Sequence, residues 1–353
     1  MEEYLNQTPE LQPIPDTPPQ TDSTAVLRTA KRTYSRALLN IVLYGIIGEV
    51  LVILLVGILS LAGKYDDMHM NLKYIVNFMP MYFIAFPIYL LLSKPMEKIA
   101  PQQHKMTFGQ FVIAFMMCEG IAIAGSLIGT VITTILTLLF DVNTSSSLLT
   151  DGVFGEGQVV FCIVAVLFAP IVEEFLFRKV LIDRVRKYGD GTAILLSGIM
   201  FGLFHGNFTQ CFYAAGLGLF FAFIYVRTGK IQYTIALHMC MNFIGSVVSG
   251  FVLKDIDLES LLSASASMDV EAMMGQIGSL VPLFIYEAIV YSIAIAGVVL
   301  LIVNRKKFTV APPMVQLEKG KQAKTAWLNL GAIAMLVYCV LLFIFQIVDQ
   351  MAE

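Results

Sequence analysis

Two carboxylates stand next to each other in an apolar stretch of this sequence, at Glu173 and Glu174, and an arginine follows at Arg178. In a helix, Glu174 and Arg178 share one face and can pair, because they are four residues apart. Adjacent carboxylates that lose their water repel each other, which suits a group that accepts and then donates a proton near neutral pH. Pro170 comes shortly before the acids, removes one backbone hydrogen bond and predicts a kink there.

Later apolar stretches carry three more polar groups, which are His205, His238 and Asn242. His238 and Asn242 are four residues apart, so they project from one helix face. A charged group at mid-bilayer costs several kcal/mol, so an ionisable side chain there calls for an explanation. Taken alone, each group also has a structural explanation, because intramembrane histidines and amides form hydrogen bonds between helices.

Membrane-spanning helices must position these groups. Of the 353 residues, 57% are hydrophobic and only 14% are charged, whereas a soluble protein has about 25% charged residues. Lipid is therefore the main solvent, and the sequence predicts an all-α polytopic bundle with eight or nine membrane spans. The candidate spans are Leu38–Ala62, Tyr74–Leu92, Phe111–Phe140, Val159–Val180, Thr192–Phe208, Cys211–Val226, Ile231–Leu253, Val281–Val303 and Ala326–Val348. The fifth and sixth spans are short, and the sixth could instead be tilted or partly re-entrant.

Positive charge is segregated between the two sides that nine spans define. All of the 23 lysines and arginines except Lys64, Lys73 and Lys254 fall on the side of the N-terminus. The positive-inside rule therefore predicts a cytoplasmic N-terminus. The proline-rich start of the chain has no signal-peptide layout, and we expect an integral protein of the bacterial plasma membrane.

The depths of the polar groups favour one shared site. Glu173 and His205 are each 14 residues from the hairpin that joins their spans, roughly 21 Å along a helix. Antiparallel neighbours would hold the two side chains at one level. His238 lies only seven residues into its span, roughly 10 Å, so the levels agree if the hairpin protrudes about 10 Å further into the cytosol.

The polar groups form three motifs, which are Glu173-Glu174-xxx-Arg178, Phe201-xxx-His205 and His238-xxx-Asn242. In this order and spacing they resemble the motifs of the CPBP family of intramembrane proteases. This family, also called Abi, includes the type II CAAX prenyl endopeptidases. The resemblance covers about residues 158–250, and three motifs in register are far more specific than any one of them.

The resemblance implies an intramembrane endopeptidase that hydrolyses a peptide bond of a membrane-embedded or lipidated substrate. Glu173 with His205 would activate a water as general base, and the water would attack a peptide carbonyl. His238 and Asn242 would donate hydrogen bonds to the oxyanion, each worth roughly 3–4 kcal/mol in other enzymes. The expected partners are a peptide or membrane protein and the lipid bilayer, and no basic, aromatic-rich segment suggests nucleic acid.

By the same resemblance, Glu174 and Arg178 would orient and tune this set. The family has been described both as metalloproteases and as glutamic proteases, and we favour a site without a metal. The chain has no H-E-x-x-H pair, and adjacent glutamates do not face one point on a helix. Zinc is the alternative cofactor, with Glu173, His205 and His238 as its ligands. The five cysteines lie in or beside apolar runs and predict core positions rather than a disulfide framework.

We expect five regions, which are a disordered cytoplasmic tail (1–30), N-terminal transmembrane helices (31–157), a catalytic transmembrane core (158–253), an extracytoplasmic loop (254–280) and C-terminal transmembrane helices (281–353). Glu49, Glu119 and Glu287 are each alone in their spans, and we interpret them as structural. Two other functions stay open. One is a non-catalytic immunity or scaffolding protein built on the same helices, and the other is a transporter or channel that uses the buried acids and histidines.

Overall fold

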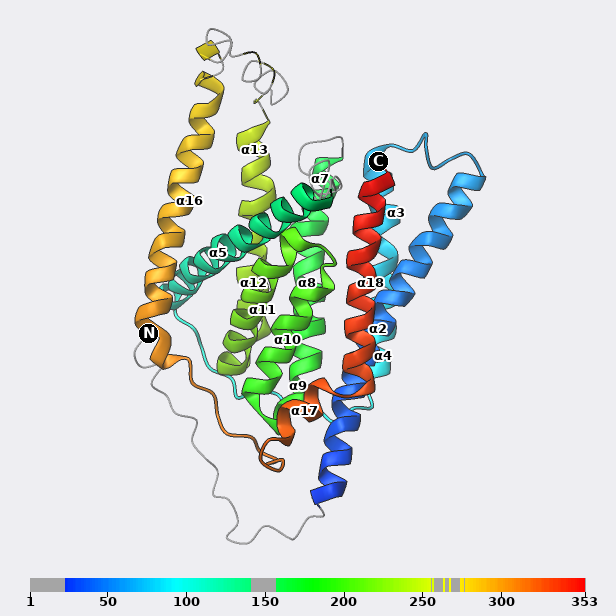
Figure 1. The fold of residues 1–353 in the computed structure, drawn as a ribbon, viewed down its shortest axis with the longest axis vertical. Coiled ribbons are helices and arrows are strands. Elements are labelled where there is room, and N and C mark those ends of the chain that lie inside the picture. The colour runs from blue at the N-terminus through cyan, green and yellow to red at the C-terminus, as the bar shows by residue number, and fades with distance from the viewer. Residues whose placement is uncertain are drawn as a thin grey trace.

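The structure, a computed structural model, contains helices and no strand in the residues that it describes (Figure 1). These are residues 23–140, 157–254 and 277–352, with residues 256, 263, 267, 274 and 275 between the last two ranges. The α-helices are α2 (Ser23–Leu61), α3 (Met70–Pro80), α4 (Phe86–Ser93), α5 (Phe108–Phe140), α7 (Gln158–Ile163), α8 (Ala169–Glu174), α9 (Leu181–Val185), α10 (Asp190–Phe204), α11 (Phe208–Thr228), α12 (Ile231–Asn242), α13 (Ser249–Leu253), α16 (Ile277–Asn304), α17 (Lys321–Trp327) and α18 (Leu330–Ala352). Turns of π-helix join several of them, at η1 (Met81–Ala85), η2 (Val164–Phe168), η3 (Phe175–Val180) and η5 (Phe243–Val248).

The prediction of an all-α polytopic bundle is confirmed. Within the described part of the chain, 8 helices are long and apolar enough to cross a membrane. The ninth expected span, Thr192–Phe208, is instead the shorter apolar helix α10, which has only 15 residues. The sixth expected span is longer than predicted, because α11 runs from Phe208 to Thr228.

Successive helices alternate between the two ends of the bundle, as Figure 1 shows. The first turn of α2, α9 and α17 lie at the lower end of that view, and the end of α18 lies at the upper end. Helix α2 already begins at Ser23, so residues 23–30 are helical and do not belong to a tail. Residues 1–22 lie outside the described residues, as does most of the expected loop 254–280.

Helix α10 ends inside the bundle because of a turn that its sequence encodes. His205 follows the last residue of α10, and Gly206 has φ +66°, a left-handed conformation that glycine adopts without strain. Asn207 is then the N-cap of α11, where its side chain accepts a hydrogen bond from the backbone N–H of Gln210 at 2.8 Å. His205 therefore lies at an elbow between two helices, and not within a continuous span.

Close contact between α10 and α11 requires glycine. A Cβ atom added at Gly202 would lie 2.5 Å from the Cβ of Ala215 and 2.5 Å from the carbonyl oxygen of Cys211. Lipid provides no hydrophobic force that drives helices together, so small residues that let backbones approach are the usual solution. The hairpin that carries His205 is thus held by glycine-mediated packing.

We expect Gly202→Ala to lower the free energy of unfolding by about 1–3 kcal/mol, because the added methyl group forces α10 and α11 apart. Gly57→Ala is the matched control, since a Cβ atom at Gly57 would meet nothing within 4 Å. Thermal unfolding of both variants in detergent measures the difference. Equal unfolding temperatures for the two variants would show that this contact does not hold the hairpin.

The N-terminal and C-terminal helices cover the central helices through aromatic contacts. Tyr44 of α2 stacks on Phe204 at the end of α10, with ring centroids 6.2 Å apart. On the other side of the elbow, Phe343 of α18 lies edge-on to Phe208, at 4.6 Å. A Cβ atom at Gly206 would lie 2.7 Å from Leu342 of α18, so α18 covers the elbow directly. The helices at both ends of the chain therefore shield the elbow at His205.

Candidate active site

Pro170 shapes the helix that carries the two glutamates. It stands in the first turn of α8, directly after the π-helical turn η2, in which the N–H of Ala169 donates to the carbonyl of Val164, five residues back. In the same register the acceptor for residue 170 would be the carbonyl of Ala165, but proline has no N–H to donate. That carbonyl instead accepts a hydrogen bond from the side chain of Asn242, at 2.8 Å. The carbonyl of Ala165, which Pro170 leaves without a backbone donor, therefore binds the side chain of Asn242 on α12.

Glu174 and Arg178 form the predicted pair, deep inside the protein. Arg178 Nε lies 3.2 Å from Glu174 Oε2, and both side chains have 0% of their surface exposed. The guanidinium carbon of Arg178 lies 4.2 Å from the ring centroid of Phe201 and 5.5 Å from that of Phe221. Neither Nη atom of Arg178 has a hydrogen-bond partner among the described residues, so aromatic faces and one carboxylate are what stabilise this cation.

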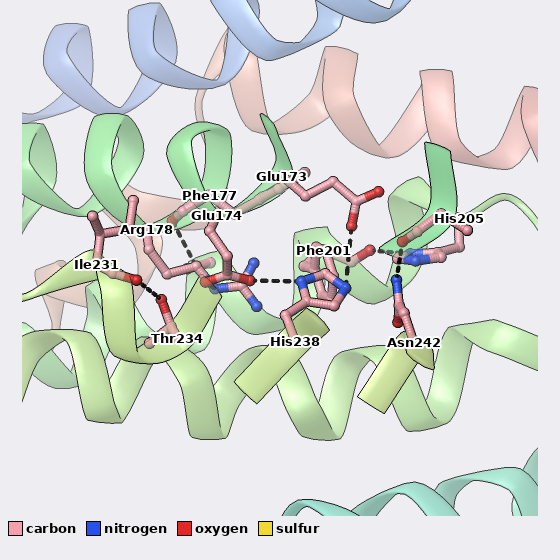
Figure 2. A network of polar contacts seen from close by, with 12 residues as sticks. Glu173, Glu174, Phe177, Arg178, Phe201, His205, Ile231, Thr234, His238 and Asn242 are labelled. Carbon is pink, nitrogen blue, oxygen red and sulfur yellow. Dashed lines mark hydrogen bonds and ion pairs between the residues drawn. The ribbon is translucent and has the colours of Figure 1, made fainter. Parts of the chain in front are cut away.

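Both glutamates reach the same imidazole, that of His238 (Figure 2). Glu174 Oε1 lies 3.0 Å from Nδ1 of His238, and Glu173 Oε2 lies 3.7 Å from Nε2. The two adjacent glutamates approach different nitrogens of the ring, so they do not meet at one point. Glu174 is fully buried, whereas 24% of the Glu173 side chain is exposed. The accessible carboxylate is thus Glu173.

The contact with Glu174 determines the position of one proton on His238. Glu174 is paired with Arg178, and an ionised carboxylate can only accept hydrogen bonds. Nδ1 of His238 must then carry a proton and donate a hydrogen bond to Glu174, whether or not Nε2 is also protonated. Nε2 is left to face Glu173 and the space beyond it.

His205 is oriented in the same way by the helix that precedes it. Its Nδ1 lies 2.8 Å from the carbonyl oxygen of Phe201, which can only accept, so Nδ1 carries a proton. Neutral His205 therefore has its lone pair on Nε2. The ring of Phe201 lies edge-on to both histidines, 4.8 Å from His205 and 5.8 Å from His238. Phe201 thus sets the relative position of the two imidazoles.

All six residues that the sequence singled out for the site lie in one group, on α8, η3, α12 and the elbow after α10 (Figure 2). They are Glu173, Glu174, Arg178, His205, His238 and Asn242. Three contacts within the site were not predicted from the sequence, those made by the ring of Phe201, the ring of Phe221 and the carbonyl of Ala165. Phe201 was present in a motif, four residues before His205, but its contact with His238 could not be inferred from spacing along one helix.

The residues proposed from the sequence as zinc ligands are Glu173, His205 and His238. In the parts of the chain that the structure describes, no group of three His, Cys, Asp or Glu side chains is placed to hold a metal ion. Nδ1 of each histidine is already bonded within the protein, to Glu174 for His238 and to the Phe201 carbonyl for His205. Nε2 of both rings is left open, and Glu173 Oε2 lies 3.7 Å from Nε2 of His238.

Comparison with known proteins finds similarity in the segment that contains the site. Residues 155–244 match the family model described as Type II CAAX prenyl endopeptidase Rce1-like. The "Putative membrane peptidase YdiL" of Bacillus subtilis (strain 168) is 35% identical over 81 residues, which are 23% of this chain and 33% of that protein. The matched part thus spans about one third of that relative. No solved structure matches the chain.

The matched segment contains the whole group of Glu, Arg, His and Asn side chains described above, from the carbonyl of Ala165 to Asn242. The helices on either side of it are apolar and long enough to span a membrane. Residues 155–244 are therefore similar to the Rce1-like type II CAAX prenyl endopeptidases, and they lie within an integral membrane protein.

Proposed function

We propose that this chain is an intramembrane endopeptidase that hydrolyses a peptide bond in a membrane-embedded or lipidated peptide or protein. One observation carries the proposal: a partly exposed carboxylate, Glu173, lies 3.7 Å from Nε2 of an imidazole that a buried Glu174–Arg178 pair holds in place. The match of residues 155–244 to a family of prenyl endopeptidases supports the reaction class.

Glu173 and His205 are proposed to activate the attacking water. The Glu173 carboxylate accepts one proton of the water, and Nε2 of His205 accepts a hydrogen bond from the other. The water oxygen forms a bond to the carbonyl carbon of the substrate, whose C=O double bond becomes a C–O⁻ single bond. Glu173 then gives its proton to the leaving amine as the C–N bond breaks, which produces a carboxylic acid and a free amine.

Asn242 and His238 are proposed to stabilise the oxyanion. One N–H of the Asn242 amide is held by the carbonyl of Ala165, which fixes the plane of the amide and leaves the second N–H to donate. His238 donates from Nε2 when its ring carries both protons, with Nδ1 directed at Glu174. In a site that excludes water, such fixed donors contribute more than they do in solution.

Asn242→Ala should lower kcat by about 10²–10³-fold, because an oxyanion donor is lost. Its effect on stability should be only about 1 kcal/mol, the usual worth of one neutral hydrogen bond. Cleavage of a lipidated reporter peptide in proteoliposomes measures kcat. Asn77→Ala serves as the control. It removes an amide of α3 that donates to the carbonyl of Lys73 and to the hydroxyl of Tyr65, far along the chain from the site. Equal losses of activity in both variants would remove Asn242 from the proposed mechanism.

We propose that the reaction needs no metal. Among the residues that the structure describes, no three His, Cys, Asp or Glu side chains are grouped as metal ligands would be. Dialysis of the purified protein against a strong chelator should leave more than about half of its activity, because no step of the mechanism uses a metal. Loss of activity on chelation, restored by added zinc, would instead support Glu173, His205 and His238 as ligands.

The lower end of the bundle in Figure 1 is proposed to face the cytoplasm. Basic residues lie in the last turn of α11, just after α4 and α16 and just before α17 on that side, as at Arg227, Lys94, Arg305 and Lys319. This distribution satisfies the positive-inside rule for an N-terminus in the cytoplasm. A bacterial plasma membrane is the proposed location.

A further inference from the structure

A pocket of about 490 Å³ opens at the lower end of α4, away from the residues of the Rce1-like site. Three cationic side chains line it, those of Lys94, Lys98 and Arg184, together with the apolar side chains of Leu90 and Leu91. Its volume lies in the range of pockets that bind small molecules. The pocket therefore combines positive charge with an apolar wall.

Arg184 is the fixed part of this pocket. It is 8% exposed, and its guanidinium donates to backbone carbonyls, from Nε and Nη2 to Ser93 at 3.1 and 2.9 Å and from Nη1 to Val180 at 3.1 Å. Carbonyl oxygens orient a guanidinium but carry no full charge to neutralise it. Arg184 is therefore a buried cation held in a fixed orientation in the pocket wall, which is a built element of an anion site.

The nearby carboxylates are already paired elsewhere. Asp183 lies 2.8 Å from Lys179 and accepts a hydrogen bond from Tyr225 at 2.7 Å, and Glu97 pairs with Lys187. Lys94 and Lys98 form no ion pair in the part of the chain that the structure describes. The pocket thus gathers three positive charges, and the Asp183 carboxylate, which acts on Arg184, is shared with Lys179.

The position of the pocket decides which anion fits. Lys94 directly follows Ser93, the last residue of the candidate span Met70–Ser93, so the cations lie where the hydrocarbon ends and the headgroups begin. Leu91 is 67% exposed on the lipid-facing side of α4, and it continues into the pocket wall. Basic pockets between membrane helices are a recognised setting for anionic lipid headgroups.

We propose that this pocket binds one anionic phospholipid, with the phosphate of its headgroup at Arg184, Lys94 and Lys98 and an acyl chain along Leu90 and Leu91. A soluble anion would use the three cations but not the leucines. A zwitterionic lipid would place a compensating positive charge among the cations. The combination of the two surfaces selects an amphiphile with net negative charge.

Native mass spectrometry of the full chain in detergent, with phosphatidylglycerol or phosphatidylcholine added, tests the proposal. The wild type should retain one phosphatidylglycerol and bind phosphatidylcholine more weakly. Each lysine near a membrane surface contributes about fivefold to affinity for an anionic lipid, so Lys94→Gln with Lys98→Gln should weaken binding about 30-fold. Both lysines are exposed, and their loss should leave the unfolding temperature unchanged.

Lys319→Gln with Lys324→Gln is the matched control, because it removes the same charge from exposed positions at the same end of the bundle. This variant should bind phosphatidylglycerol as the wild type does. Equal binding by all three proteins would overturn the proposal, as would equal retention of both lipids. Displacement of the lipid by millimolar inorganic phosphate would show a site for soluble anions and would also overturn it. None of these outcomes depends on proteolysis.

Discussion

Replacement of Glu173 by glutamine should lower the rate of peptide-bond cleavage by about 10²–10⁴-fold, the range expected when a general base is removed. Glutamine has the same shape but cannot accept a proton from water at neutral pH. Glu173 is the carboxylate with 24% of its side chain exposed, whereas Glu174 is fully buried against Arg178. The accessible carboxylate is therefore the one that a water and a substrate can reach.

The measurement is single-turnover cleavage of a lipidated peptide by Glu173→Gln in proteoliposomes, with thermal unfolding measured in parallel. Folding should be unaffected, because Glu173 is partly exposed and its ion-pair contact with His238, among the described residues, is a long one of 3.7 Å. Glu49→Gln is the control, since it makes the same chemical change at an exposed carboxylate of α2. Ordinary turnover by Glu173→Gln would favour the non-catalytic immunity or scaffolding function and remove the proposed base.

Arg178→Met should lower the free energy of unfolding by about 3–5 kcal/mol, the usual cost of removing one partner from a buried ion pair. Methionine fills part of the space between the two aromatic rings. It leaves the fully buried Glu174 carboxylate without the positive charge of Arg178. The carboxylate would also hold His238 less firmly, so cleavage should slow as well.

Thermal unfolding in detergent measures this effect, and a second substitution identifies its cause. Glu174→Gln with Arg178→Met should be more stable than Arg178→Met alone by about 1–3 kcal/mol, because no buried charge is then left unpaired. Lys187→Met breaks the more exposed pair with Glu97 and should cost at most about 1 kcal/mol. Equal free energies of unfolding for the Arg178 and Lys187 variants would show that the buried pair stabilises the fold no more than the exposed pair does.

The membrane spans and the membership of the site could be predicted from sequence because their causes are local. Long apolar runs determine the spans, and helical spacing places Glu174 beside Arg178 on one face. Counting residues predicts one level for Glu173 and His205, and it brings His238 to that level only if the hairpin between their spans protrudes. The 3.7 Å contact of Glu173 with His238 agrees with that condition. These inferences need no knowledge of how the helices pack.

The elbow at His205 was not predicted, although its signals are present in the sequence. Gly206 and Asn207 are a glycine in a left-handed conformation and an N-cap, which together end one helix and start another. The expected span Thr192–Phe208 includes both residues, because the stretch before His205 is mostly apolar. In lipid such an elbow is tolerated only where protein covers it, which α18 does here through Leu342.

Contacts between helices could not be predicted from the sequence. The carbonyl of Ala165 binds Asn242 because Pro170 leaves it without a donor in a π-helical turn, and that register is not visible in the sequence. The approach of both glutamates to His238 depends on where α12 crosses α8. Packing of this kind is decided by three-dimensional complementarity, which no spacing along one helix reveals.

The most direct test of the central claim follows the oxygen of the attacking water. A single turnover of a lipidated peptide in proteoliposomes is run in H₂¹⁸O, and the products are weighed by mass spectrometry. If the water beside Glu173 attacks the substrate carbonyl, the new carboxylate carries one ¹⁸O atom in the wild type, and Glu173→Gln gives no product. An unlabelled carboxylate in that first turnover, or no cleavage by the wild type of any lipidated or membrane-embedded peptide offered, would contradict this account.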